Sequence, residues 1–427
     1  MQSLLRSLRH RNFRLFVAGQ SVSLVGTWIT RVATGWLVYR LTGSELLLGV
    51  VGFAGQIPML VLSPLAGVLI DRRDRHQVLI WTQVLSVGQS AALAVLTLSG
   101  VITVTHVILL QLLQGVINSF DTPARQAFVV QMVEDRADLS NAIALNSTMV
   151  NGSRIVGPAI GGAIIAAVGE GWCFFVDAVS YAAVIASLLA MRVPKVNPPE
   201  EVVPLREAFR AGFQYISGFL PVRAALTLVA ITSVFGMPYV VLMPAVAKEV
   251  LGGTANTLGL LMAASGAGAV GGALYLASRT TVVGLGRHMA IGTLVFGSAL
   301  AAFGLSRDLM LSLALLPAIG AGFMIALAAT NTVVQTLVPE ELRGRVMAFY
   351  ATAFLGMAPI GSLLAGVVAD RIGTAPTIVG GGICCALAGL WFFRALPELR
   401  AIVRPIYIER GILTMPAPQP VEGQSDT

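Results

Sequence analysis

Apolar segments of about 20 residues recur along the whole chain of 427 residues, separated by shorter stretches that carry most of the charge. About 20 apolar residues are what a helix needs to cross the roughly 30 Å hydrocarbon core of a bilayer. Because lipid offers no hydrogen-bond partners, each segment has to satisfy its backbone groups internally, as a helix does. The sequence therefore predicts an all-α membrane protein.

The low proportion of charge excludes an ordinary soluble domain. Only 11% of the residues are charged, against roughly 25% in soluble proteins. A soluble surface has to be covered with polar groups, so the apolar surface of this chain must face lipid. The net charge of +7 does not indicate nucleic-acid binding, because the Lys and Arg residues lie in short clusters between apolar segments.

Twelve spans are expected, divided six and six by a Pro-rich segment of mixed charge. They cover residues 14–40, 46–70, 77–99, 103–122, 139–168, 172–192, 223–247, 256–278, 286–305, 309–336, 344–369 and 374–395. We expect an N-terminal six-helix bundle over 1–192 and a cytoplasmic linker over 193–222 that includes an amphipathic segment. A C-terminal six-helix bundle follows over 223–395, and then a cytoplasmic, disordered tail over 396–427.

The basic residues predict the orientation of the chain. Most of them lie at the N-terminus, after the even-numbered spans and in the tail, whereas Arg40, Lys248, Arg307 and Arg371 lie on the other side. Because cytoplasmic loops are enriched in Lys and Arg, both termini should be cytoplasmic, in a multi-pass protein of the plasma (inner) membrane. The basic N-terminus has no apolar core, so we expect no cleavable signal peptide.

Two short motifs lie in the N-terminal half. The first runs from Gly67 through Asp71 and Arg72 to Arg75 at the end of span 2, and the second is Gly157-Pro158-Ala-Ile-Gly161-Gly162 in span 5. The first resembles the 2–3 loop signature of the major facilitator superfamily, with Asp74 in place of its usual Gly. The second resembles the motif typical of the antiporter branches of that superfamily, with Ser153 in place of its first small residue.

A third stretch resembles one subfamily. It reads Phe-Asp-Thr-Pro-Ala-Arg over residues 120–125, followed by Asn-Ala-Ile-Ala-Leu-Asn-Ser over residues 141–147. It is similar to the subfamily of enterobactin-type siderophore exporters and drug efflux pumps, and the resemblance covers roughly residues 10–395. What it implies is the major facilitator fold, in which two pseudo-symmetric bundles rock about a central cavity.

The resemblance also implies a conformational lock. In such families the aspartate of the 2–3 loop caps helix 11, and its basic partner pairs with an acid at the end of helix 4. Here Asp71 would cap the helix that begins near Arg345, and Arg75 would pair with Asp121. A carboxylate at a helix N-terminus stabilises it by roughly 0.3–1 kcal/mol at an exposed site. The alternative is a basic cytoplasmic loop without a lock.

Polar residues inside the spans step by three or four, and so share helix faces. A membrane helix with a polar stripe turns it away from lipid. The expected cavity residues are Gln20, Thr27, Arg31, Gln56, Gln114, Asn118, Asn151, Arg154, Asn331 and Gln335. The C-terminal half offers mainly Met and aromatic faces, such as Tyr239 and Phe354, which more often serve packing. These patterns predict an asymmetric cavity suited to an amphipathic substrate.

The internal arginines support the sharpest hypothesis. A charge within a span is costly unless it faces water or a partner. Arg31 would therefore contact substrate or a gate, or else snorkel outward or pair with Asp177, and Arg154 poses a similar choice. Because two internal arginines outweigh one internal acid, we expect a substrate with an anionic or phenolic head.

The energy source and the chemistry follow from what the spans contain. Proton antiport needs a titratable group in the membrane, and the candidates are Asp177 and Asp121. The chain lacks the GxxxxGK[ST] motif that would indicate ATP as the motor. We expect neither a cofactor nor a metal site, and no enzyme, since no cluster of catalytic residue types lies inside the spans.

The leading prediction is a proton-coupled, secondary-active exporter of small amphipathic molecules, drug-like or siderophore-like, that works by alternating access. Its expected partners are the lipid bilayer, the substrate and the proton gradient, with no nucleic acid, and the protein should be a monomer. The alternative is a lysophospholipid or lipid flippase of the same fold, in which the arginines would bind a phosphate.

Overall fold

The computed structural model describes residues 6–71, 73–133, 138–192, 205–279 and 281–413, and the elements that it assigns within these ranges are all helical. The first half contains η1 (Arg6–Arg9), α1 (Arg11–Thr42), α2 (Glu45–Asp71), α3 (Arg75–Leu98), α4 (Val104–Gln131), α5 (Leu139–Val168) and α6 (Glu170–Leu189). The helix α7 (Leu205–Gly218) follows.

The second half contains two segments interrupted by π-helical turns. One is α8 (Leu220–Ile231), η3 (Thr232–Gly236), α9 (Tyr239–Ala245) and η4 (Val246–Val250), and the other is α13 (Glu340–Ala351), η5 (Thr352–Gly356) and α14 (Met357–Ile372). The uninterrupted helices are α10 (Ala255–Ala277), α11 (Leu285–Leu305), α12 (Leu309–Leu337) and α15 (Thr374–Glu409). Each interrupted segment corresponds to one expected span.

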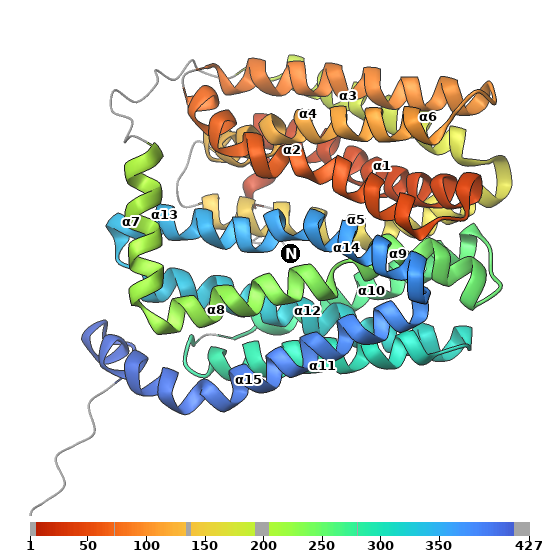
Figure 1. The fold of residues 1–427 in the computed structure, drawn as a ribbon. Coiled ribbons are helices and arrows are strands. Elements are labelled where there is room, and N and C mark those ends of the chain that lie inside the picture. Colours follow the sequence, from red (N-terminus) through yellow and green to blue (C-terminus); the bar gives the residue numbers. More distant parts are fainter. Residues whose placement is uncertain (1–5, 72, 134–137, 193–204, 280, 414–427) are drawn as a thin grey trace, which may run out of the picture.

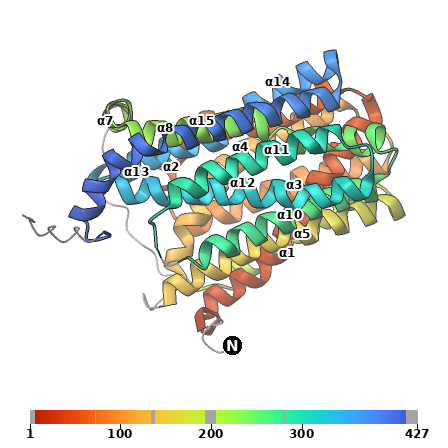
Figure 2. The same cartoon turned by 90° about the horizontal axis from the view of Figure 1, so that it is seen from below.

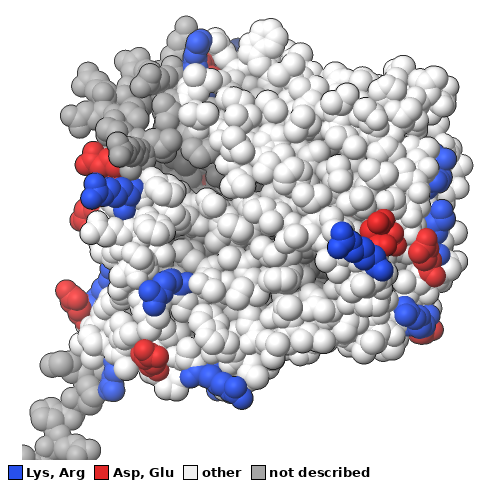
Figure 3. Space-filling view, viewed as in Figure 1, with Lys and Arg blue, Asp and Glu red and all other residues white. Residues whose placement is uncertain are grey.

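The long helices have the composition of membrane spans. Ten segments of the described chain are long and apolar enough to cross a bilayer. The other two long helices, α1 and α4, carry polar stripes. They are 32 and 28 residues long and pack among the membrane-spanning helices of their bundle. On the face drawn in Figure 3, charged side chains gather toward the two ends and leave an uncharged belt between them. The prediction of an all-α membrane protein is confirmed.

The helices form two bundles, α1–α6 and α8–α15, which lie side by side in Figure 1. We call the end where α1, α3, α5 and α13 begin the proximal end, and the opposite end the distal end. The helix α7 lies across the proximal end, since it is perpendicular to the long helices in Figure 1 and is seen end-on in Figure 2. The expected amphipathic segment is thus a helix, while residues 193–204 of the expected linker lie outside the described residues.

The two bundles meet along two seams, α2 with α14 and α5 with α10. Both seams are tight in their distal halves, where glycines allow backbones to touch. A Cβ added at Gly162 would lie 2.7 Å from the carbonyl oxygen of Ala255, and one added at Gly366 would lie 2.8 Å from that of Glu45. At the proximal end, α13 packs mainly on α7, α8 and α12 of its own half. The two bundles are therefore held together chiefly through the distal half of the seams.

The last helix is longer than expected. We predicted that the final span ends at residue 395 and that a disordered tail begins there, but α15 continues to Glu409. Leu396, Leu399 and Tyr407 are buried against the C-terminal bundle, and Arg410 donates to carbonyl groups at the end of α12, including that of Leu337. Tertiary packing thus maintains a helix that contains Pro397 and Pro405. Residues 414–427 lie outside the described residues.

Candidate substrate cavity

Arg31 and Arg154 lie over the same aromatic ring. The Arg31 guanidinium carbon, from α1, is 4.7 Å from the centroid of Trp28, and that of Arg154, from α5, is 5.8 Å away. Arg31 is exposed although it lies well within α1. Since α1 is flanked by α5 and α6 of its own bundle and by α9 and α10 of the other, the space that Arg31 faces is internal. The structure thus brings the two predicted arginines together at one interior site.

The glycine motif of α5 creates room for this site. A Cβ added at Gly157 would collide with the Trp28 side chain, and one added at Gly161 would lie 3.2 Å from the backbone of Ile29. Gly162 and Pro158 face α10 instead. The motif therefore packs against α1 on one face of α5 and against α10 of the C-terminal bundle on another face. Close helix packing explains these residues, and an antiporter role stays a prediction.

Asp177 does not pair with Arg31, which corrects one of the two alternatives for that arginine. Its carboxylate, 1% exposed, accepts hydrogen bonds from Ser90 at 3.0 Å and from Ser180 at 3.5 Å. Within the described part of the chain, no ion pair involves Asp177. Hydroxyl groups of α3 and α6 satisfy this acid, because α6 turns it toward α3.

A buried polar stripe on α3, which the sequence analysis did not single out, organises the N-terminal bundle. Thr82 and Gln83 donate to Asp121 at 3.0 and 2.7 Å, and Ser90 donates to Asp177. The steps of three and four between the buried residues Thr82, Gln83, Ser86, Gln89 and Ser90 could have revealed it. This stripe links the two acids that we named as proton-coupling candidates to one helix.

Several predicted cavity residues are engaged within their own bundle. Gln114 donates to Ser86 and Asn118, and Thr27 donates to the Ser23 carbonyl and lies 3.5 Å from the Tyr181 hydroxyl. Three others bond along their own helices, since Gln56 donates to Gly52, Asn151 to Ser147 and Gln335 to Asn331. Gln20 is buried. Helical periodicity predicted that these residues share a face, but it could not predict which neighbouring helix packs against that face.

The expected lock remains a prediction. The side chain of Asp71 and all of Arg72 lie outside the described residues. Asp121 forms an ion pair with Arg125, 3.3 Å away, in addition to its bonds from Thr82 and Gln83. A Cβ added at Gly67 would meet no atom within 4 Å, so close packing does not explain that glycine. Arg75 is half-buried at the start of α3.

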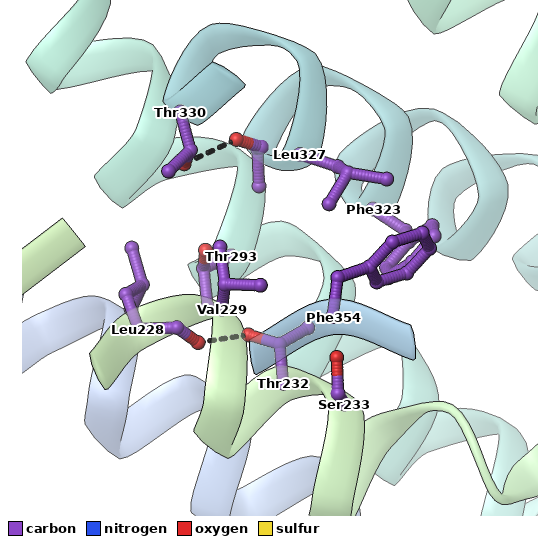
Figure 4. A pocket seen from close by; sticks show the side chains of 10 residues that line it. Leu228, Val229, Thr232, Ser233, Thr293, Phe323, Leu327, Thr330 and Phe354 are labelled. Atoms are coloured by element: carbon purple, nitrogen blue, oxygen red, sulfur yellow. Dashed lines mark hydrogen bonds between the residues drawn. The ribbon is translucent and has the colours of Figure 1, made fainter. Parts of the chain in front are cut away.

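The C-terminal bundle contains a pocket, drawn in Figure 4, between α8, η3, α11, α12 and η5. Phe354, a predicted candidate, lines it together with Phe323, while the wall also carries Thr232, Ser233, Thr293 and Thr330. The other candidates are tied into packing, since the Tyr350 hydroxyl donates to Leu327 and that of Tyr239 lies 2.7 Å from Ser265 Oγ. The sequence analysis missed the hydroxyl groups of this pocket, although Thr232 and Ser233 stand adjacent in an apolar span.

Known proteins resemble this chain over almost its whole length. A family model described as transmembrane secretion effector matches residues 2–405. The staphyloferrin A transporter of Staphylococcus aureus is 25% identical and aligns with 91% of this chain and 97% of its own length. The multidrug efflux pump Tap of Mycolicibacterium fortuitum is 29% identical over 88% and 93%. Macrolide efflux protein A of Streptococcus pyogenes is 25% identical over 83% and 89%.

Solved structures share the fold. A bacterial homologue of the human lysosomal transporter Spinster, inward-facing and unoccupied, matches with a TM-score of 0.71 at 14% identity and covers 96% of this chain and 99% of its own. A POT family transporter matches with a TM-score of 0.69 at 11% identity, over 91% and 96%. At these identities the likeness establishes the architecture alone.

Proposed function

Because this chain belongs to the transmembrane secretion effector family of major facilitator transporters, we propose that it is a proton-coupled exporter of small amphipathic anions. Its substrates would be drug-like or siderophore-like, in keeping with relatives that are a siderophore transporter and efflux pumps. It would work as a monomer in the plasma membrane, with the two bundles rocking about an interior site.

The arginine pair is the observation that carries the anionic preference. Arg31 and Arg154 place two positive charges over Trp28 inside a membrane protein, where an uncompensated charge is costly. Asp177 accepts a hydrogen bond from Ser90 and forms an ion pair with neither arginine in the described part of the chain. An anionic head between the guanidinium groups would neutralise them, and a planar group would stack on the indole ring.

Asp177 is the better of the two candidates for proton exchange. Asp121 already has Arg125 as a counter-ion and accepts hydrogen bonds from Thr82 and Gln83. Asp177 is buried beside hydroxyl groups without a cation, so its charge is costly and its proton can be bound and released during the cycle.

We assign the proximal end to the cytoplasm, because the basic residues at the chain start, those in the described part of the loop that follows α2, and Arg343 and Arg345 at the start of α13 lie there. Both termini are then cytoplasmic, and the tight distal seams close the site from the outside. The bundles span residues 1–192 and 223–395, and α7 belongs to the cytoplasmic linker. Epitope tags at either terminus that reacted in intact cells would reverse this orientation.

The test compares culture medium and cell contents between a deletion strain and an overexpressing strain, with and without a protonophore. We expect an anionic amphipathic compound that is enriched outside the overexpressing cells, retained inside the deletion strain and sensitive to the protonophore. If the medium is unchanged and lysophospholipids shift within the cell envelope, the protein is a lipid flippase and the export proposal fails.

A further inference from the structure

The pocket of the C-terminal bundle is apolar apart from its hydroxyl groups, and all but one of these are satisfied. Thr232, Thr293 and Thr330 each donate to a backbone carbonyl of their own helix at 2.7 to 2.9 Å. Ser233 is 1% exposed, and its hydroxyl has no hydrogen-bond partner among the described residues. Its oxygen points into the pocket in Figure 4. A buried hydroxyl without a partner is destabilising unless something bonds to it.

Two of the walls are π-helical. Ser233 belongs to η3, Phe354 belongs to η5, and the two segments contact each other. Single π-helical turns inside longer helices are rare and occur often at functional sites. Here η3 follows α8 and η5 follows α13, and both π-helical turns contribute residues to the pocket.

An aromatic series leads from the arginine site to this pocket. The ring centroids of Tyr239 and Phe296 are 6.4 Å apart, those of Phe296 and Phe323 are 5.5 Å apart, and those of Phe323 and Phe354 are 6.0 Å apart. At its first member, the Tyr239 hydroxyl lies 2.7 Å from Ser265 Oγ, and a Cβ added at the next residue, Gly266, would lie 2.5 Å from the carbonyl oxygen of Arg154. At its last two members, Phe323 and Phe354 are only half-buried and stand at the pocket.

We propose that this pocket is a second subsite, which takes an aromatic or branched apolar group carrying one hydrogen-bonding atom for Ser233. This inference rests on the proposed function, since the group is the apolar end of the substrate whose anionic head lies between Arg31 and Arg154. The Phe323 and Phe354 rings move aside to admit it. The C-terminal bundle then selects the apolar end of a substrate while the N-terminal bundle selects its charge.

The experiment asks whether the pocket admits an apolar aromatic group. Ser233→Cys, in the full-length protein in nanodiscs, is treated with benzyl methanethiosulfonate, and the labelled peptide is quantified by mass spectrometry. The introduced thiolate bonds to the benzyl-bearing sulfur, the bond between the two sulfurs of the reagent breaks, and methanesulfinate leaves. Ser312→Cys is the matched control, because Ser312 is equally buried in the same bundle but its hydroxyl donates to Ser306.

We expect labelling of Ser233→Cys to be at least about tenfold faster than that of Ser312→Cys, and to be slowed by neutral 4-phenylbutanamide. Thr330→Cys, on the opposite wall in Figure 4, is the second variant and should behave like Ser233→Cys. Equal, slow labelling at all three positions would overturn the subsite. Fast, protectable labelling in a protein that exports nothing would instead keep the subsite and remove the export proposal.

Discussion

At the scale of single residues, the interior arginines are explained by what surrounds them. Neither Arg31 nor Arg154 forms an ion pair within the described chain, and both use Trp28 as a neighbour. Cation–π contact with Trp is worth roughly 0.5–2 kcal/mol, which is less than the cost of a charge in the membrane. The contact with Trp28 therefore does not by itself offset that cost.

Arg31→Gln should therefore discriminate between charged and neutral substrates. We expect uptake of 4-phenylbutyrate into inside-out vesicles to fall by about tenfold, because one charge contact is worth roughly 1.4 kcal/mol or more at such a site. Uptake of the neutral 4-phenylbutanamide should change little. Arg371→Gln, at an exposed distal position, is the control. An equal loss of uptake for the acid and the amide would show that Arg31 does not discriminate substrates by charge.

Asp177→Asn should separate transport from its driving force. The asparagine carbonyl still accepts the hydrogen bond from Ser90, so the bundle should fold. We expect substrate exchange across vesicles to persist while accumulation driven by a pH gradient is lost, since the amide cannot carry a proton. Asp370→Asn, which alters an exposed acid, should retain both activities. Retained gradient-driven accumulation in Asp177→Asn would refute the coupling role.

Asp138, at the proximal start of α5, predicts a pH dependence outside the membrane. Its hydrogen bond with His10 and the nearby Arg6 guanidinium lower the pKa of Asp138. Because the folded pKa lies below the unfolded value, this link stabilises the protein above about pH 4 and is lost as the pH falls through the folded pKa. We expect the N-terminal segment to become sensitive to an acid protease only at low pH, and Asp138→Asn to be sensitive already at pH 5. Equal resistance of both proteins at pH 5 would contradict this.

At the scale of elements, α7 of the linker packs on the C-terminal bundle. Its Phe209 and Phe213 rings lie 4.9 and 6.4 Å from the Phe349 ring of α13, and Gly212 allows the two helices to touch. The amphipathic pattern over 205–216 predicted a helix, but it did not reveal that α13 is the helix on which it packs. The predicted lock would engage α13, so α7 contacts the helix whose movement that prediction concerns.

Phe349→Ala should loosen α7 without unfolding the bundle. Each aromatic pair is worth roughly 0.5–1.5 kcal/mol, so losing two should speed amide exchange in α7 by about fivefold to a hundredfold. Hydrogen–deuterium exchange of the peptide over residues 205–218 measures this. Phe393→Ala removes an exposed ring of α15 and is the control. Unchanged exchange in Phe349→Ala would mean that other contacts hold α7.

At the scale of the whole molecule, the distal seams decide which end is open. The backbones of α2 and α14 touch at Gly49 and Gly366, and Thr374 donates to Glu45 at 3.0 Å beside them. A side chain at Gly366 would clash with backbone atoms of Glu45 and Gly49, so the two helices would have to separate to accommodate it. We therefore expect this seam to be the distal stop for rocking of the bundles.

Gly366→Leu should shift the purified protein toward a distally open state. Labelling of Val241→Cys, half-buried behind this seam, by the hydrophilic reagent 2-sulfonatoethyl methanethiosulfonate reports the opening. We expect at least about a tenfold rise in rate, which corresponds to roughly 1.4 kcal/mol in the balance between the two states. Gly380→Leu, where an added Cβ meets nothing within 4 Å, is the control. Equal rates in the two variants would contradict the distal stop.

The sequence by itself determined the class of protein, an all-α membrane protein. Segments of about 20 apolar residues in a chain with 11% charge have one stable arrangement in lipid, which is a set of helices. The motifs at Gly67–Arg75 and Gly157–Gly162 named the superfamily that the family match confirms. These features are local, so a linear pattern is enough to specify them.

Only the tertiary structure decided which side chains meet. Periodicity placed Thr27, Arg31 and Gln114 on helix faces, but it could not show that Arg31 joins Arg154 on Trp28 or that Asp177 turns to Ser90. Likewise, α15 continues to Glu409 past Pro397 and Pro405 because contacts with residues distant in the chain hold that segment. A helix repeat specifies which residues share a face, whereas the neighbour of that face depends on how helices far apart in sequence pack together.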